Sequence, residues 1–284
     1  MTPRFVAAVL GAGCAAGSPV AVVDLGAAAL GPVASLEALE AAVAGGAAVV
    51  RLPVALSADR VPLLIDGPRL DIARCETVFG AALTEDSAPW VLLLDAAELQ
   101  ASYRCDGLPP ATLDAALDAL AGGPGVGVAI EARYLPNVSH DPEVFAAEIL
   151  ARWPAAAPPG PLWLVGDLDV TVGALEARAA ALGADAALVR RWPRVPPEGS
   201  AVAARAGQAV LEGWGLLDPV DAALGAGADV LWLSPDAAAA GSVARAEAAG
   251  LGVWVGPVAR PAAARAAALP GVGALVLPDP AVLP

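Results

Sequence analysis

The sequence predicts an α/β fold, a single (β/α)8 TIM barrel with a β-hairpin extension and an insert after the second strand. Short apolar runs alternate with alanine-rich helical segments along nearly the whole chain. The runs are continuously apolar, which is typical of parallel strands covered on both faces. About eight such repeats fit a barrel of this length. A doubly wound sheet is the alternative, but no G-x-G-x-x-G follows the first strand.

Nine apolar runs are candidate strands, one more than a barrel needs. The stretch VVRLPVALSADRVPLLIDG explains the extra run, because its linker SADR is too short to contain a crossover helix. The run 61–66 therefore returns antiparallel to 47–54, and an insert at about 67–124 follows. The nine runs are 19–24, 47–54, 61–66, 125–131, 161–167, 185–190, 229–234, 252–256 and 273–277.

Helical segments lie between these strands, and several begin at a capping residue or a proline. Ser35 and Thr112 are suited to cap the first two, and Pro142 opens the third. The expected helices are 35–44, 111–121, 141–153, 171–182, 241–249 and 260–269.

The barrel domain is expected to span residues 19–284. Residues 1–18 form either a weak export signal, with Cys14 at a lipoprotein-like position, or a segment that closes the bottom of the barrel. We favour the second interpretation and, with it, a cytoplasmic location over an exported one. No other stretch is both long and apolar enough to span a bilayer, so no transmembrane segment is predicted.

The composition argues against nucleic acid as a partner. The formal net charge is -14, and affinity for a phosphate backbone comes mostly from basic side chains. The three cysteines, Cys14, Cys75 and Cys105, are odd in number and widely spaced, so neither a zinc site nor a disulfide framework is predicted. Because only 16% of residues are charged, alanine must cover much of the helical exterior, which would suit an oligomer.

Charged residues stand at the carboxyl ends of the predicted strands or just beyond them. In a barrel these ends line the functional mouth, so the mouth is expected to be polar and of mixed sign. The residues are Asp24, Arg51, Asp66, Glu131, Arg133, Asp167, Arg190 and Asp279.

In order and spacing these segments resemble the glycerophosphodiester phosphodiesterases, metal-dependent (β/α)8 hydrolases. PVAVVDLG is similar to the family's first strand, and VVRLPVALSADRVPLLIDG to its second strand and hairpin. VAIEAR resembles the Glu-x-Lys strand, and the segment from GLGVWVGP to PDPAVL resembles the two closing βα units. The likeness runs from about residue 19 to 284.

The residues that the resemblance implies for catalysis are largely replaced. Asp24 stands at the family's first histidine, and Arg51 and Pro53 stand at the two acids of Glu-x-Asp. Asp66 and Gly67 replace the His-Asp pair of the hairpin. The framework is therefore expected without the family's usual chemistry.

Two positions keep the family's character. Glu131 keeps a metal-ligand identity, and Arg133 keeps the charge of the family's lysine. Phosphodiester cleavage needs a base and an acid near neutral pH, and the resemblance implies two histidines for these roles. This chain has a single histidine, His140, so it cannot hold such a pair.

Two interpretations of the mouth remain open. Asp24, Asp66 and Glu131 could converge on Mg²⁺ or Ca²⁺, with Asp24 and Asp66 as the candidate catalytic residues. Alternatively Arg51 pairs with these carboxylates and replaces the cation, in which case no cofactor is needed; we favour this interpretation. The basic residues Arg51, Arg133, Arg190 and Arg191 are the candidate ligand-binding set for an anionic small molecule, because arginine suits phosphate and carboxylate groups.

The leading hypothesis is a pseudoenzyme of this family that has lost metal-dependent hydrolysis and binds a phosphate-bearing or other anionic small molecule. One alternative is an active metal-dependent phosphoric diester hydrolase of lipid metabolism with rewired acid and base residues. A second alternative is a structural protein that forms oligomers through its alanine-rich exterior.

Overall fold

The structure of the chain is a computed structural model that describes residues 19–26, 30–121, 123, 125–156, 160–192, 218–235, 237–258 and 260–279. Residues 1–18, where an export signal or a barrel-bottom segment was expected, lie outside these ranges. Within them, no helix is both long and apolar enough to cross a membrane.

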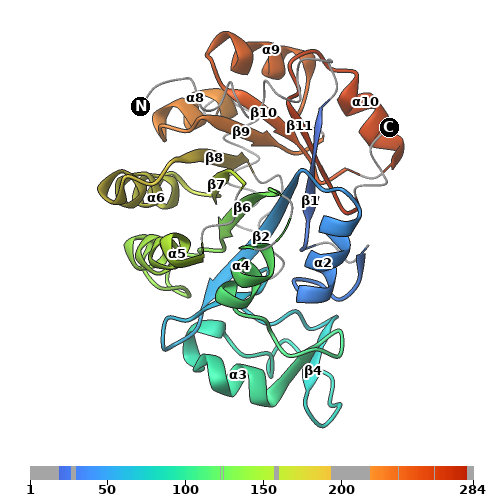
Figure 1. Ribbon diagram of the computed structural model, residues 1–284, viewed down its shortest axis with the longest axis vertical. Coiled ribbons are helices and arrows are strands. Elements are labelled where there is room, and N and C mark those ends of the chain that lie inside the picture. The colour runs from blue at the N-terminus through green and yellow to red at the C-terminus, as the bar shows by residue number, and fades with distance from the viewer. Residues whose placement is uncertain are drawn as a thin grey trace.

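Eight parallel strands close into a barrel, as the sequence predicts (Figure 1). β1 pairs with β11 on one side and with β2 on the other, and these pairings complete the ring. The apolar runs account for this arrangement, because nearly every strand residue is buried. The barrel strands are β1 (Val20–Asp24), β2 (Val49–Leu56), β6 (Gly127–Ala132), β7 (Leu162–Gly166), β8 (Ala186–Trp192), β9 (Val230–Leu233), β10 (Gly252–Val255) and β11 (Ala274–Leu277).

The hairpin extension is also confirmed. β3 (Pro62–Leu64) runs antiparallel to the end of β2, with Val54 opposite Leu64 and Leu56 opposite Pro62. β2 is longer than the other barrel strands, and its last residues extend past the ring; Val54–Leu56 pair with β3. The hairpin therefore places Asp66, two residues after β3, back at the barrel mouth.

Helices surround the barrel in the expected alternation. Ser35 caps the first of them, since its Oγ accepts a hydrogen bond from the amide of Ala38. One helix, α8, was not predicted. The helices are α2 (Leu36–Ala44), α4 (Leu113–Ala121), α5 (Pro142–Ala156), α6 (Asp169–Leu182), α8 (Pro219–Gly225), α9 (Ala240–Ala248) and α10 (Arg260–Ala267).

Aromatic side chains fill the interior of the barrel. The ring of Trp254 lies 5.7 Å from that of Trp163 and 6.3 Å from that of Trp232, measured between centroids. Small and branched residues such as Ala129 and Val189 pack around them. The interior is a solid core, on top of which the mouth residues rest.

The insert between β3 and β6 is a small structure at one end of the molecule in Figure 1, and its apolar core includes Ala55 and Leu63 of the β2–β3 hairpin. It contains β4 (Cys75–Thr77), a short 3-10 helix, η2 (Val91–Leu93), α3 (Ala96–Ser102) and β5 (Tyr103–Cys105). The predicted range of about 67–124 is too long, because α4 packs against α2 and α5 as part of the barrel's helical layer.

A disulfide joins Cys75 to Cys105, and the expectation of no disulfide framework is therefore wrong. The two cysteines are 30 residues apart and form no recognisable motif. They meet because β4 and β5 pair antiparallel with Cys75 directly opposite Cys105. Only the register of these two strands brings the sulfur atoms together.

Candidate functional site

Seven charged side chains meet at the barrel mouth. Asp24 ends β1, Arg51 lies in β2, Glu131 in β6 and Arg191 in β8. The other three follow strands by one or two residues, at the same edge. We call this set the arginine–carboxylate cluster: Asp24, Arg51, Asp66, Glu131, Arg133, Asp167 and Arg191.

Arg51 is the centre of the cluster, with only 1% of its side chain exposed. Its Nη1 donates to Asp24 and its Nε donates to Glu131. Its Nη2 donates to Oδ1 of Asp66 at 3.0 Å. One guanidinium therefore engages three carboxylates from three different strands or strand ends, and the pairing that the sequence favoured is present.

Arg133 and Arg191 complete the network. Nη1 of Arg133 lies 2.6 Å from Oε1 of Glu131 and 3.2 Å from Oδ2 of Asp167. Its Nε lies 3.1 Å from Oδ1 of Asp66, in an ion pair without hydrogen-bond geometry. Arg191 also donates to Glu131. Glu131 is fully buried and pairs with three guanidiniums, those of Arg51, Arg133 and Arg191.

Trp232 forms the floor of the cluster. The guanidinium carbon of Arg191 lies 4.7 Å from the centre of its ring, and that of Arg51 lies 5.7 Å away. Both cations therefore lie over an electron-rich aromatic face as well as beside carboxylates. The ring is held in place by its Nε1, which donates to the backbone oxygen of Gly256 at 2.9 Å.

The pKa values of the cluster follow from this geometry. Burial acts to raise the pKa of Glu131, but the charges of Arg191, Arg51 and Arg133 outweigh it and hold this pKa well below its ordinary value. For Asp66 the same competition lowers the pKa, with Arg51 as the main opposing charge. Burial alone would lower the pKa of Arg51, but its carboxylate partners raise it well above the usual value.

Asp167 behaves differently. Burial raises its pKa, and the charges of Arg191 and Arg133 do not cancel that effect. Its Oδ1 is buried and accepts no hydrogen bond. Four carboxylates and three guanidiniums leave one negative charge when all are ionised (3 − 4 = −1), and a proton on Asp167 would neutralise it. From the sequence, Asp167 was expected at the barrel mouth, but no role was assigned to it.

The cluster does not fit a divalent cation. The oxygens of Asp24, Asp66 and Glu131 meet at the guanidinium of Arg51, which has no lone pair to offer a metal. A Cβ on Gly26 would lie 2.6 Å from both Arg51 Nη1 and Asp66 Oδ2, so the cluster side chains pack closely against the Gly26 backbone and leave no room there even for a methyl group. Among the described residues, no group of three or more His, Cys, Asp or Glu side chains is placed to hold a metal ion.

Two other sequence candidates lie outside the cluster. Arg190 is adjacent to Arg191 but points to the other face of β8, where its Nε donates to Asp169 at 2.8 Å. Alternation along a strand separates these neighbours, so they do not form one binding surface. Nε2 of His140 lies 2.7 Å from the backbone oxygen of Ser57 and joins the loop before α5 to the β2–β3 turn.

A pocket lies beside the cluster, between the barrel and the insert. Asp66 borders both of them, with a third of its side chain exposed. The pocket has a volume of about 120 Å³ and continues from Gly26 past Ser35 to the disulfide. Its charged lining residues are Asp66, Arg69, Asp71, Arg74 and Asp106.

No protein-family model matches the chain, and no curated protein matches it in sequence. Solved structures do match its fold. A protein from Silicibacter pomeroyi DSS-3 described as a glycerophosphoryl diester phosphodiesterase is 20% identical with a TM-score of 0.75, and the match covers 93% of this chain and 92% of that one.

Two further structures show the same likeness. A phosphodiesterase from Oleispira antarctica, solved with the product sn-glycerol-3-phosphate, is 17% identical with a TM-score of 0.67, covering 93% and 95% of the two chains. A glycerophosphodiester phosphodiesterase from Agrobacterium tumefaciens is 19% identical with a TM-score of 0.62, covering 93% and 98%. These similarities establish a shared fold, which agrees with the resemblance drawn from the sequence.

Proposed function

We propose that this chain, which has the fold of the glycerophosphodiester phosphodiesterases, is a pseudoenzyme that does not carry out their metal-dependent hydrolysis. The observation that carries this proposal is the position of Arg51. Its guanidinium lies where the oxygens of Asp24, Asp66 and Glu131 meet, so a positive side chain takes the place of a cation. Bringing a divalent ion close to that charge would be strongly unfavourable.

The acid–base requirement supports the same conclusion. The only histidine, His140, contacts the backbone of Ser57 and is absent from the cluster. Glu131, with its lowered pKa, is a weak base. Asp167, with its raised pKa, could donate a proton, but Arg51 leaves no place for the metal-activated nucleophile that it would have to serve.

A second candidate function, binding of a phosphate-bearing small molecule, is favoured by one observation. Nε of Arg133 is buried and makes no hydrogen bond, although Oδ1 of Asp66 lies 3.1 Å away, so its hydrogen-bonding capacity is not satisfied within the cluster. The surplus negative charge of the cluster opposes an anion, and protonation of Asp167 would remove that opposition. We therefore propose that any such binding strengthens as the pH falls toward the pKa of Asp167.

A hydrolysis assay on the purified full chain tests the main proposal. Glycerophosphocholine is supplied with Mg²⁺, with Ca²⁺ or with a chelator, and release of glycerol phosphate is followed. No release above the uncatalysed rate is expected in any condition. Metal-dependent turnover that Asp66→Ala abolishes, and that the surface variant Asp114→Ala retains, would replace the proposal with a rewired hydrolase built on Asp24, Asp66 and Glu131.

Calorimetric titration with Ca²⁺ tests whether Arg51 is what keeps a divalent cation out of the cluster. The wild type is expected to bind no Ca²⁺ at micromolar concentration. Arg51→Ala is expected to gain affinity, because it leaves Asp24, Asp66 and Glu131 together without their central cation. Arg152→Ala, which removes a surface guanidinium, serves as the matched control. Micromolar binding by the wild type that Glu131→Gln removes would contradict the proposal.

Titration with sn-glycerol 3-phosphate at pH 5 and pH 7.5 tests the second candidate. Tighter binding at the lower pH, lost in Arg133→Met, supports it. Equal binding by the wild type and Arg133→Met would contradict it.

A further inference from the structure

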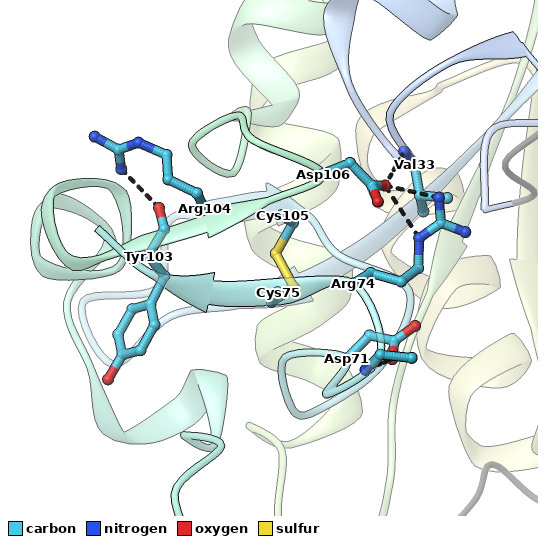
Figure 2. The surroundings of a disulfide bond; sticks show 9 residues. Val33, Asp71, Arg74, Cys75, Tyr103, Arg104, Cys105 and Asp106 are labelled. Carbon is cyan, nitrogen blue, oxygen red and sulfur yellow. Dashed lines mark hydrogen bonds and ion pairs between the residues drawn. A yellow bond between two sulfur atoms is a disulfide. The ribbon is translucent and has the colours of Figure 1, made fainter. Parts of the chain in front are cut away.

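The disulfide of the insert lies beside the pocket that borders the arginine–carboxylate cluster. Cys75 and Cys105 both line this pocket, opposite Gly26 and Asp66 on the barrel side. The bond connects β4 to β5, two strands of three residues each (Figure 2). It is therefore both a brace of the insert and part of the pocket wall.

Apart from this bond, the connection between the two strands is slight. β4 and β5 form a separate two-stranded sheet with three residue pairs. The amide of Cys75 donates to the backbone oxygen of Asp71 and that of Cys105 to the backbone oxygen of Leu108, so both bond within their own segments. Next to the disulfide, one backbone hydrogen bond crosses between the segments, from the amide of Asp106 to the oxygen of Arg74 at 2.8 Å. A two-stranded ribbon is marginal in water by itself, and this one is supported by the apolar core against which Cys75, Tyr103 and Cys105 pack. The sulfur–sulfur bond is its only covalent cross-link.

The residues that flank the cysteines attach the insert to the barrel. Arg74, just before Cys75, directs Nε and Nη2 to Oδ2 of Asp106 at 3.0 and 2.7 Å. Asp106, just after Cys105, accepts a hydrogen bond from the amide of Val33 at 3.0 Å. Figure 2 shows both side chains next to Val33, at the end of the β4–β5 ribbon that carries the disulfide. Holding the cysteines together therefore holds this three-residue contact together.

Val33 belongs to the loop that leads back to the cluster. The next residue, Ala34, donates its amide to the backbone oxygen of Leu25 at 2.7 Å. Leu25 precedes Gly26, whose amide donates to Oδ1 of Asp24 and whose backbone lies close against the Arg51 guanidinium. A continuous series of direct contacts thus runs from the disulfide to the backbone beside the cluster.

We propose that Cys75–Cys105 is a reducible bond that controls the width of the pocket beside the cluster, which is narrow while the bond is intact and widens when the bond is reduced. A dithiol reductant attacks one sulfur through its thiolate, the sulfur–sulfur bond breaks, and a mixed disulfide forms. The second thiolate of the reductant then displaces the remaining cysteine. The protein gains two electrons and two protons as two thiols, and the reductant becomes a disulfide.

The structural consequence follows from the weakness of the ribbon. Without the covalent link, β4 and β5 are held only by three residue pairs, by the hydrogen bond from the Asp106 amide to the Arg74 oxygen and by the solvent-accessible Arg74–Asp106 ion pair. Reduction therefore loosens the spacing of Arg74 and Asp106. The contact with Val33 is then released and the insert side of the pocket moves away from the barrel side. Because disulfides persist in oxidising compartments and are reduced in the cytosol, the surroundings of the protein would set the state of the pocket. The inference does not depend on whether the mouth hydrolyses a phosphodiester.

Hydrogen exchange of the full chain tests this inference. A Cys14→Ser background leaves only the two cysteines of interest, so thiol titration should count none before dithiothreitol and two after it. The amide of Val33 is the main probe, since it donates directly to Asp106. We expect its exchange to accelerate at least tenfold on reduction, while the barrel amide of Val23 is unchanged.

Two variants control the experiment. In Asp106→Ala the amide of Val33 should exchange rapidly in both redox states. Glu76→Ala, which removes a different carboxylate next to Cys75 in β4, should keep the redox dependence. The double variant Cys75→Ser/Cys105→Ser should match the reduced protein, and if it fails to fold, the reduced Cys14→Ser protein still gives the answer. Two free thiols before reduction, resistance of the bond to dithiothreitol, or acceleration confined to residues 75–105 would each overturn the inference.

Discussion

Arg51 shows how far one side chain decides the chemistry of this mouth. A buried guanidinium is costly to remove from water, and the cost is met here by three carboxylates and the face of Trp232. The same carboxylates are costly without it, because Glu131 is fully buried and Asp24 nearly so. Each charge is therefore stable only in the presence of the others.

Removal of this single charge should destabilise the whole chain. Arg51→Met keeps much of the side-chain volume but leaves its carboxylate partners short of a cation. The free energy of unfolding should fall by about 3–5 kcal/mol, the usual effect of breaking a buried pair from one side. Urea unfolding followed by circular dichroism measures the difference.

Arg152→Met is the matched control at the surface. Arg152 pairs with Asp114 at 3.2 Å and Glu148 at 2.9 Å, but these ion pairs are only partly buried, with 20% of the Arg152 side chain exposed against 1% for Arg51. Its loss should cost only about 0–1 kcal/mol. Equal effects of the two substitutions would show that Arg51 is no more than an ordinary surface partner.

At the scale of single elements, the first turn of α2 connects the pocket to the barrel. Ser35 lines the pocket, and its buried Oγ accepts the hydrogen bond from the amide of Ala38 that begins the helix. The preceding loop carries Val33 and so receives the insert. The start of this helix therefore fixes one wall of the pocket.

Ser35→Ala should weaken that start. The amide of Ala38 loses its acceptor, and the free energy of unfolding should fall by about 1 kcal/mol, the typical value for an N-cap. Ser35→Asp keeps an acceptor at the same place and should restore most of the loss. Thermal unfolding of the three proteins measures both effects, and a neutral Ser35→Ala would contradict the assigned cap.

The beginnings of the helices and the turn of the hairpin could be predicted because they depend on neighbouring residues. Ser35 and Thr112 accept from amides three residues ahead, and the SADR turn joins adjacent strands. The strands β4 and β5 could not be predicted. Each has three residues, and they pair across an intervening segment that contains a helix, so no local periodicity reveals them.

At the scale of the whole molecule, the cluster couples stability to pH. Unfolded Glu and Asp titrate near about 4.3 and 3.9, whereas the folded state holds the pKa values of Glu131 and Asp66 below these. Their stabilisation is therefore fully present above about pH 4 and is lost as the pH falls through the folded values. The contribution of Asp167 to stability changes with pH in the opposite direction, because its pKa in the folded state is raised. This contribution is fully present below the unfolded value and is lost as the pH rises through the raised folded value.

Two pH series should separate these effects. Wild-type stability should decline as the pH falls below about 4. The stability of Asp167→Asn should increase relative to that of the wild type as the pH rises from about 4 toward neutrality. The wild-type aspartate must ionise while buried, whereas the asparagine carries no charge at any pH. Urea midpoints in 0.5 M NaCl measure both, because salt screens the exposed part of the net charge of -14. A constant difference between the two proteins would contradict the raised pKa.

The sequence by itself determined the barrel, the hairpin and the charged residues at the mouth. Apolar runs, helix caps and strand ends are local properties, and the single histidine is a matter of counting. The tertiary structure alone decided which charges meet. Arg51 and Glu131 are 80 residues apart, Asp167 joins them from a third strand, and alternation along β8 turns Arg190 away. Ion pairs and the disulfide form between distant residues, and only closure of the barrel and the register of its strands bring those residues within reach.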